Sequence, residues 1–361
     1  MKIIFPSLGT FSTQEIREFN TIDDSYEGQA MQFCQQWLSG QQVFTVSTSG
    51  STGVPKPITV YRSQMQASAR MTAQALGLAA GDHALVCLNT GYIGGKMMLV
   101  RGMELDMDMT VIPPASHPFA GFKVDAHFDF TALVPLQLQQ TLADQPEYIP
   151  LLNRMKAIIV GGAAVSYPLQ TLTRLLKVPV YNTYGMTETV SHIALKRLNG
   201  KEEADEYRVL PGVEIAQDTR GCLMIKAPSS NDQWLTTNDL VKLLDAQRFE
   251  WLGRVDNVIN SGGVKIQVEK VEEKTERVFV ELGITARFIV AGLPHELLGQ
   301  QVTLIIEGAA HGGETETKIL TALQNVLDKY EVPRSVRYVS QFAETETGKI
   351  DRKRIQLKIR N

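Results

Sequence analysis

Cysteine is scarce in this 361-residue chain, and the three cysteines, Cys34, Cys87 and Cys222, are far apart. None belongs to a CxxC pair. Disulfide frameworks and structural zinc sites need paired or closely spaced cysteines, so the sequence argues against both. We expect these cysteines to be reduced and mostly buried.

Long apolar runs and a large net charge are also lacking. No stretch approaches the roughly 20 apolar residues that a membrane-spanning helix needs. The short apolar run at the N-terminus is interrupted by Pro6, so we expect no secretory signal and a cytoplasmic location. A formal net charge of −3 gives no general reason to expect nucleic acid or an anionic membrane as partner. Small molecules are the expected partners, and a homodimer is compatible with the sequence.

The composition is that of a globular protein, with 43% hydrophobic and 21% charged residues. The length suits two domains of about 250 and about 100 residues. Apolar β-type segments alternate with amphipathic segments before residue 209, where short strands and turns take over, and a new unit follows Arg254. We therefore predict a large α/β domain at residues 1–253 and a small α+β domain at residues 254–361.

Hydroxyl residues, glycines and a lysine crowd into residues 47–56 (STSGSTGVPK). Glycines let backbone N–H groups turn toward an anion, while hydroxyl groups and lysine add donors and charge. The spacing is not that of a Walker A loop, and Pro55 and Pro57 are incompatible with the helix that should follow one. We predict a phosphate-binding loop within a hairpin of residues 43–46 and 58–61; the alternative is a flexible surface turn. The candidate phosphate ligands are Thr48, Ser49, Gly50, Ser51, Thr52, Gly53 and Lys56.

Two adjacent glycines, Gly161 and Gly162, follow an apolar strand and precede Ala163. Small residues at the end of a strand let a flat ligand approach the backbone closely. A tight strand-to-helix turn would have the same sequence, so both interpretations stay open.

The segment at residues 183–189 (TYGMTET) places an aromatic ring, hydroxyl groups and a carboxylate in a short stretch. Tyr184, next to Gly185, offers a ring that can stack on adenine. Thr187 and Glu188 offer the hard oxygen ligands that Mg²⁺ requires. An isolated glutamate in a loop is more often simply solvated.

These segments, in this order along the chain, resemble the core motifs of the adenylate-forming superfamily, which contains acyl-CoA and aryl-CoA ligases, luciferases and peptide-synthetase adenylation domains. The resemblance spans nearly the whole chain. It implies the adenylate-forming enzyme fold: a large N-terminal α/β domain with a β-rich subdomain, and a small mobile C-terminal α+β domain that acts as a lid. It also implies that residues 47–56 hold pyrophosphate and that residues 161–163 line the adenine pocket.

The same resemblance implies roles for three charged residues farther along the chain. Asp239 would bind the ribose of ATP, although Asn238 stands where the family usually has glycine. Arg254 would lie near the ribose. Asp256 would be the hinge about which the small domain rotates.

The last two motifs that resemble the family follow the hinge. Ser261, Gly262 and Gly263 would line the tunnel for the pantetheine arm of coenzyme A. Lys349, within residues 347–352 (TGKIDR), would be the catalyst of adenylation, although a lysine in a basic tail is by default solvated.

The reaction implied by the resemblance has two steps and uses ATP, Mg²⁺ and coenzyme A. The acid attacks the α-phosphate of ATP, which joins two anions, so Mg²⁺ at Glu188 and Thr187, the phosphate loop and Lys349 must neutralise charge. The small domain then swings, Lys349 leaves, and the thiol of coenzyme A enters.

The early position of the phosphate loop, with residues 91–106 and 183–200, resembles shortened o-succinylbenzoate-CoA ligases of menaquinone biosynthesis. Such a substrate carries a second carboxylate, which needs a cationic or polar partner. Candidate partners are Lys96, Arg101, His192, Lys196 and Arg197. We favour His192 and Lys96, the first because it follows the TYGMTET segment and the second because it lies in a Gly-Gly-Lys turn.

Other functions remain open from the sequence. An aryl-acid activating domain that loads a carrier protein would share every ATP motif. A fatty acyl-CoA ligase is less favoured because the chain is short and the expected pocket polar. Lys349 and Glu188 disfavour a non-catalytic binding protein of the same fold, and the failed Walker spacing disfavours a simple ATPase.

Overall fold

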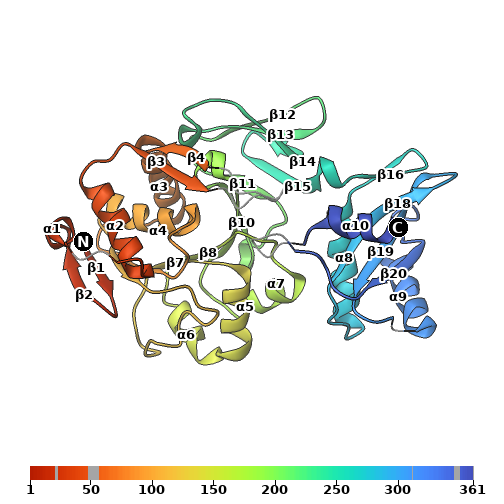
Figure 1. Ribbon diagram of the computed structural model, residues 1–361, viewed down its shortest axis with the longest axis horizontal. Helices are drawn as coiled ribbons and strands as arrows, with labels where there is room; N and C mark the ends of the chain where they lie inside the picture. The colour runs from red at the N-terminus through yellow and green to blue at the C-terminus, as the bar shows by residue number, and fades with distance from the viewer. Residues whose placement is uncertain (21–22, 48–56, 311, 345–349, 361) are drawn as a thin grey trace.

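The computed structural model describes residues 1–20, 23–47, 57–310, 312–344 and 350–360. Within these residues the strands form a large sheet, a smaller sheet and a separate two-stranded hairpin. Figure 1 shows the unit with the smaller sheet at one end of the molecule, beside the unit with the large sheet. The last strand of the large sheet ends at Arg254 and the first strand of the smaller sheet begins at Ile259. The boundary that we predicted, between residues 253 and 254, lies one residue before the end of this last strand, and it stays a proposal.

A sheet of thirteen strands dominates the described part of the larger unit. In chain order its strands are β1 (Lys2–Phe5), β2 (Gly9–Ser12), β5 (His83–Val86), β6 (Asp108–Val111), β7 (Phe130–Leu133), β8 (Ala157–Val160), β9 (Val180–Gly185), β10 (His192–Arg197), β11 (Tyr207–Val209), β12 (Glu214–Gln217), β13 (Cys222–Lys226), β14 (Leu235–Asp245) and β15 (Arg248–Arg254). Their order across the sheet is β12-β13-β14-β15-β11-β10-β9-β8-β7-β5-β6-β1-β2. From β1 to β9 neighbouring strands pair in parallel. From β9 to β12 they pair antiparallel, which confirms the predicted change to short β-structure after residue 209.

Helices cover both faces of the parallel part of the sheet (Figure 1). Because side chains alternate along a strand, Ala84 and Val86 of β5 join the core under one set of helices and Leu85 joins the core under the other. Burial on both faces explains why these strands are continuous apolar runs in the sequence. The first set is α2 (Tyr26–Leu38), α3 (Arg62–Leu76) and α4 (Ile93–Glu104), and the second is α5 (Pro135–Asp144), α6 (Ile149–Leu152) and α7 (Tyr167–Thr173); α1 (Thr13–Glu18) follows β2.

The hairpin predicted on either side of the phosphate loop is confirmed. Strands β3 (Val43–Ser47) and β4 (Pro57–Tyr61) pair antiparallel, with Val46 opposite Ile58. Ser47 and Pro57, which flank residues 48–56, are therefore held next to each other, while the loop residues themselves lie outside the described part of the chain.

The sequence of residues 63–76 (SQMQASARMTAQAL) predicts a helix with Ser63 as its N-cap and Gly77 just past its end. The structure contains this helix, α3, but the predicted N-cap is wrong. Ser63 lies inside the helix, and Tyr61 occupies the N-cap position without a side-chain cap. The first turn is completed instead by Gln64, whose Oε1 accepts a hydrogen bond from the Tyr61 backbone N–H at 2.9 Å. The predicted end is confirmed, because Gly77 adopts the left-handed backbone (φ 68°) that favours glycine after a helix.

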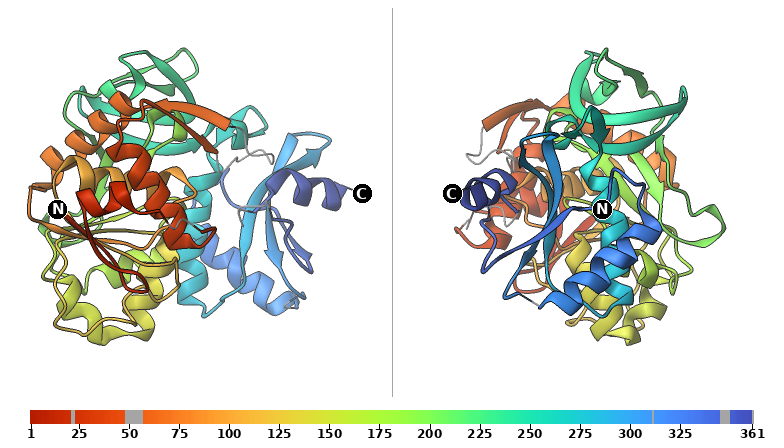
Figure 2. Two further views of the ribbon diagram at one scale, coloured as in Figure 1. Left: turned by 60° about the vertical axis from the view of Figure 1, so that its left-hand side comes forward. Right: turned by 90° about the vertical axis from the view of Figure 1, so that its right-hand side faces the viewer.

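The smaller unit packs helices against a mixed sheet (Figure 2). Strand β19 pairs antiparallel with β16 and β18 and parallel with β20. Its core is made by apolar residues of this sheet and of the first two helices. The strands are β16 (Ile259–Ser261), β17 (Val264–Ile266), β18 (Phe288–His295), β19 (Gly299–Glu307) and β20 (Ser335–Val339), and the helices are α8 (Val268–Glu281), α9 (Gly313–Val326) and α10 (Arg352–Arg360).

Helix α8 of the smaller unit contacts helix α7 of the larger unit. The backbone N–H of Tyr167 donates to Oε2 of Glu276 at 2.8 Å, and the Arg277 guanidinium lies 5.1 Å from the centre of the Tyr167 ring. Burial is the main cause that raises the pKa of Glu276. Any rotation of the small unit away from this arrangement has to break these contacts.

Five short 3-10 helices complete the described secondary structure: η1 (Pro146–Tyr148), η2 (Thr187–Thr189), η3 (Gly200–Glu202), η4 (Pro228–Ser230) and η5 (Val255–Asn257). The three cysteines are free and buried, as predicted from the sequence. Of the helices in the described ranges, none has both the length and the apolar character needed to cross a membrane.

Candidate active site

Tyr184 and Asp239, which are far apart in the sequence, meet in the structure. Tyr184 lies at the carboxyl end of β9 and its hydroxyl donates to Oδ2 of Asp239, on β14, at 2.7 Å. The other carboxylate oxygen of Asp239 accepts from the Trp251 indole N–H at 3.3 Å and lies 3.6 Å from the Arg254 guanidinium. Three of the residues to which the resemblance assigned ATP contacts are thus brought together.

The environment of Tyr184 keeps its hydroxyl protonated. Burial, followed by the neighbouring Asp239 carboxylate, raises the pKa of Tyr184. Its ring packs edge-on against the rings of Phe249 (5.3 Å between centres) and Tyr207 (5.7 Å). The hydroxyl therefore acts as a donor that orients Asp239, and the packed ring is held in one place.

Arg254 connects the proposed ribose ligand to the proposed hinge. It faces Asp239 in the register between β14 and β15. Its guanidinium also donates to Oδ2 of Asp256, in η5, at 3.1 Å. Asn238 donates to the same oxygen at 3.2 Å and accepts from Arg220 at 3.0 Å. Asn238, which stands where the family usually has glycine, thus lies in a strand and binds Asp256, the proposed hinge.

The glycine pair at 161–162 follows β8 at the carboxyl end of the parallel strands, an edge of the sheet where ligands of α/β proteins bind. Gly161 lies so close to Thr183 that a Cβ atom would be 2.2 Å from its Oγ1. Gly162 has a φ of 87°, a conformation that favours glycine. Ala163 is exposed beside them. Packing and backbone conformation alone thus require both glycines, and the exposed edge remains available to a flat ligand.

Thr187 and Glu188, the predicted Mg²⁺ ligands, lie in η2 immediately after β9. Glu188 is exposed and forms no ion pair with another residue of the described ranges. Nowhere in the described residues do three His, Cys, Asp or Glu side chains form a ready-made metal cage. A single free carboxylate fits Mg²⁺ nonetheless, because Mg²⁺ in nucleotide sites is held by one or two carboxylates together with phosphates and water.

The backbone is strained directly after Glu188. Val190 is fully buried and has a φ of 68°, which is an unfavourable conformation for a β-branched residue. Strain of this kind costs on the order of 1–3 kcal/mol and persists where surrounding contacts hold it. Here the Thr189 hydroxyl both accepts and donates hydrogen bonds within the turn. It donates one of them to the Ser191 carbonyl at 2.8 Å. The turn therefore holds the Glu188 backbone in a defined position.

Ser261, Gly262 and Gly263 form the turn between β16 and β17. Ser261 pairs with Val264, so the two glycines are a two-residue hairpin loop. Their φ angles of 60° and 85° match a turn type that needs left-handed backbone at both positions. The turn by itself explains both glycines, and their proposed place along the pantetheine tunnel stays a prediction.

The two residues that we favoured for the second carboxylate lie in different surroundings. His192 is 5% exposed, and its Nε2 lies 3.2 Å from the Thr72 hydroxyl. Lys96 is half-buried beside helix α2; its ammonium donates to the Thr90 carbonyl at 2.7 Å and lies 5.3 Å from the centre of the Phe33 ring. The described contacts do not join Lys96 and His192 into one cluster.

Two groups of predicted site residues lie outside the described part of the chain. They are the phosphate-loop residues at 48–56 and the predicted catalytic lysine, Lys349. The structure does describe the residue that follows each segment. Pro57, after the phosphate loop, begins β4, and Ile350, after Lys349, forms a β-bridge with Glu344.

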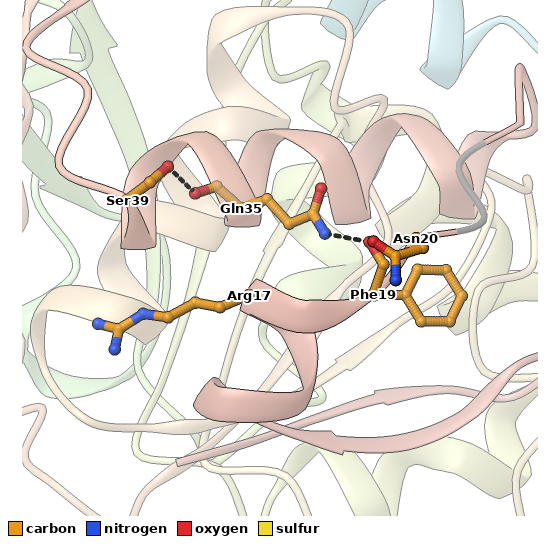
Figure 3. A pocket seen from close by; sticks show the side chains of 5 residues that line it. All are labelled: Arg17, Phe19, Asn20, Gln35 and Ser39. Carbon is orange, nitrogen blue, oxygen red and sulfur yellow. Dashed lines mark hydrogen bonds between the residues drawn. The ribbon is translucent and has the colours of Figure 1, made fainter.

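A surface pocket near the N-terminus lies among residues that the sequence analysis did not select (Figure 3). Two of its polar side chains form local hydrogen bonds: Gln35 donates to the Phe19 carbonyl at 2.6 Å, and Ser39 donates to the Gln35 carbonyl at 2.6 Å. Its lining residues are Arg17, Phe19, Asn20, Gln35 and Ser39. This pocket shares no residue with the Tyr184 and Asp239 cluster.

The sequence analysis missed two residues next to the candidate site. Trp251 contacts Asp239 because the pairing of β14 with β15 is irregular near Leu240, and such a bulge is not visible in the sequence. Ser191 follows the TYGMTET segment and binds Arg101 at 2.8 Å, a contact across the fold that spacing does not reveal.

The parallel sheet, the site at its carboxyl edge and the antiparallel extension carrying Asp239 define an enzyme of the adenylate-forming fold, which activates an acid with a nucleotide. The model of the AMP-binding enzyme family matches residues 14–220, more than half of the chain. The chain belongs to this family, so the predicted fold and the predicted class of AMP-forming acid ligase are confirmed.

Individual relatives agree with this family. An acyl-CoA synthetase (AMP-forming)/AMP-acid ligase II-like protein from Dyadobacter fermentans has a crystal structure with 43% identity and a TM-score of 0.65, and the match covers 97% of this chain and 99% of that one. The 2-succinylbenzoate--CoA ligase of Bacillus mycoides is 25% identical, over 96% of this chain and 76% of its own length. The o-succinylbenzoate coenzyme A synthetase of Bacillus subtilis, solved with ATP and a magnesium ion, has the same fold at 22% identity, with a TM-score of 0.68 over 86% of this chain and 69% of that one.

We expect the Asp239→Ala variant to raise the KM for ATP by about 10- to 100-fold, since a hydrogen bond to a charged group contributes about 1.5–3 kcal/mol. The acid's own KM should change less. The measurement is ATP-dependent pyrophosphate exchange at varied ATP concentration. Asp245→Ala, on the exposed end of the same strand, is the matched control. An unchanged KM for ATP would remove Asp239 from the nucleotide site.

Proposed function

We propose that this chain joins o-succinylbenzoate to coenzyme A through an acyl-adenylate, with ATP as the second substrate and Mg²⁺ as the metal. The observation that carries the proposal is the similarity to curated 2-succinylbenzoate--CoA ligases along almost the whole chain. The cluster of Tyr184, Asp239 and Arg254 supports it, because it offers a carboxylate held by two fixed donors at the predicted ribose position.

The residues of this chain divide the proposed chemistry among them. Asp239 would accept hydrogen bonds from the ribose hydroxyls, while the backbone at 161–163 would lie beside the adenine. Glu188, held by the strained turn, would bind Mg²⁺, which when bound neutralises charge on the phosphates. Lys349 would contact the acid and the α-phosphate, and residues 48–56 would hold the departing pyrophosphate.

The second half of the reaction requires the small unit to move in this proposal. Arg254 and Asn238 hold Asp256, which leaves η5 as the short connection between the sheets. Rotation there would carry the turn at 261–263 toward the acyl-adenylate and take Lys349 away from it. The Tyr167 contact with Glu276 would open at the same time.

A pyrophosphate-release screen over aryl and alkyl acids, with and without coenzyme A, tests the proposal. We expect release with o-succinylbenzoate and ATP, and thioester formation when coenzyme A is added. A signal with another acid and none with o-succinylbenzoate would overturn the substrate and leave the class intact. Adenylation without transfer to free coenzyme A would favour the alternative, in which a carrier protein is the acceptor.

A further inference from the structure

Helix α8 of the smaller unit holds the first residue of α7 through two contacts. Tyr167 begins α7, and its backbone N–H has no partner within the helix, because the first turn of a helix has no carbonyl group before it. Oε2 of Glu276 accepts a hydrogen bond from this N–H at 2.8 Å. The guanidinium of Arg277 lies 5.1 Å from the centre of the Tyr167 ring, within the roughly 6 Å over which a cation and an aromatic ring attract each other. We call these two contacts the Tyr167 clamp.

The clamp supplies to α7 what the larger unit leaves open. Within the larger unit, the Ser166 hydroxyl accepts from the Leu169 N–H at 3.3 Å and so caps a different position of the first turn. On the other side of the contact, Arg277 forms an ion pair at 2.5 Å with Glu273, one turn earlier on α8, which positions its guanidinium. The smaller unit therefore completes the start of a helix that belongs to the larger unit.

The same face of α8 contacts the larger unit at a second place. Glu269 lies seven residues before Glu276 on α8, a spacing that puts both side chains on one helix face. Its Oε1 accepts from the side-chain amide of Asn257, in η5, at 2.6 Å. Its Oε2 packs so close to Gly253, on β15, that a Cβ atom there would be 2.2 Å away. Both contacts are specific to this orientation, because a rotation at η5 would move Glu269 and Glu276 together.

The Tyr167 clamp lies at one end of the proposed adenine-binding segment. Residues 161–166 connect β8 to α7, and residues 161–163 are those proposed to lie beside the adenine. Close packing of Gly161 against Thr183 fixes the end that follows β8. The clamp fixes the other end at Tyr167. Because the two ends of a short connection restrict the path of its backbone, an orientation that holds Tyr167 also favours one path for residues 161–163.

We propose that Glu276 and Arg277 are positioning residues that couple the orientation of the smaller unit to nucleotide binding. The clamp holds Tyr167 while the nucleotide is bound, and rotation of the smaller unit releases it. The inference rests on the proposed function and deepens it, because it needs residues 161–163 to contact the adenine. Such coupling is reciprocal: the clamp raises the affinity for ATP, and bound ATP strengthens the clamp by the same factor.

Hydrogen exchange of the Tyr167 amide measures the clamp directly, since this is the N–H that Glu276 accepts. NMR of the full-length enzyme labelled with ¹⁵N-tyrosine resolves it, and Tyr167→Phe identifies its signal. Glu276→Ala should speed the exchange by about 10- to 100-fold, the range for a hydrogen bond to a charged group. Arg277→Ala should speed it less. Glu276→Gln keeps an accepting oxygen and should retain most of the protection, and Glu281→Ala, which removes an exposed carboxylate at the end of α8, is the matched control.

The kinetics of the same variants test the coupling, which a merely structural role of Glu276 would not produce. In Glu276→Ala the KM for ATP should rise about 5- to 20-fold, while the KM for the acid stays within about twofold of wild type. ATP added to the wild-type enzyme should slow exchange of the Tyr167 amide by a similar factor. It should have no such effect in Glu276→Ala.

Equal exchange rates of the Tyr167 amide in wild type and Glu276→Ala would overturn the clamp. Faster exchange with an unchanged KM for ATP, or with equal rises in KM for ATP and the acid, would overturn its coupling to nucleotide binding. A wild-type enzyme that released no pyrophosphate with any acid would overturn the proposed function instead. The response of the Tyr167 amide to ATP would still decide the coupling in that case.

Discussion

Replacing Lys349 by alanine is expected to slow acyl-adenylate formation by about 100- to 1,000-fold, the range for removing one group that stabilises charge in a transition state. The acid and the α-phosphate of ATP are both anions, so their approach depends on a cation between them. In our proposal Lys349 leaves the site before the thiol enters. Transfer of the acyl group from preformed acyl-adenylate to coenzyme A should therefore stay within about threefold of wild type.

Pyrophosphate release and single-turnover thioester formation separate these two steps. Lys353→Ala is the matched control, because Lys353 is an exposed lysine four residues farther along, on α10. It should leave both steps unchanged. Equal slowing of the two half-reactions in Lys349→Ala would contradict the role of Lys349, since a group used in adenylation alone cannot slow the second step.

Replacing Arg352 by methionine is expected to destabilise the protein by about 1–3 kcal/mol, because it leaves the half-buried Glu272 carboxylate without its charged partner. The Arg352 guanidinium donates to both oxygens of Glu272, one of them at 2.8 Å. The same carboxylate accepts from the Val290 backbone N–H at 2.7 Å. Burial raises the pKa of Glu272, while Arg352 and then the Val290 N–H oppose that shift, so removal of Arg352 leaves only the backbone hydrogen bond to oppose burial.

Thermal and denaturant unfolding measure this loss. The double variant Arg352→Met with Glu272→Leu should recover much of it, because two apolar groups can replace a buried ion pair at small cost. Lys318→Met breaks an exposed ion pair with Glu314 on α9 and should change stability little. If Arg352→Met were as mild as Lys318→Met, the Glu272 pair would not be the anchor of α10.

The Arg352 contact also bears on Lys349, three residues before it. Glu344, which precedes residues 345–349, forms an ion pair with Arg287 at 2.5 Å. Ile350, which follows them, forms a β-bridge with Glu344. Arg352 holds the following helix to α8 and β18. Glu344 and Ile350, the described residues on either side of 345–349, therefore both contact the smaller unit.

Local chemistry made several parts of the structure predictable. The β3 and β4 hairpin follows from two apolar runs around a loop rich in glycine and proline, and the end of α3 follows from Gly77. The buried parallel strands follow from continuous apolar segments. The N-cap of α3 was mispredicted because the Gln64 side chain satisfies the first turn in place of a serine.

The candidate site was predictable where residues that are close in the sequence act together. Thr187 and Glu188 lie on one turn, and Gly262 and Gly263 form one hairpin loop. The contacts of Trp251 with Asp239 and of Arg101 with Ser191 were not predictable, because each joins elements that only the packed sheet brings together.

The sequence by itself determined the alternation of strands and helices, the family and the kinds of group available for nucleotide chemistry, because these depend on local spacing and residue type. Only the tertiary structure decided how deeply each candidate cation is buried. The sequence named both Lys96 and Arg101 as candidate partners of a second carboxylate and favoured Lys96, which it placed in a turn; in the structure both residues lie on helix α4. Burial separates them, because Arg101 is 2% exposed and contacts α3 and β10, whereas Lys96 is half-buried beside α2.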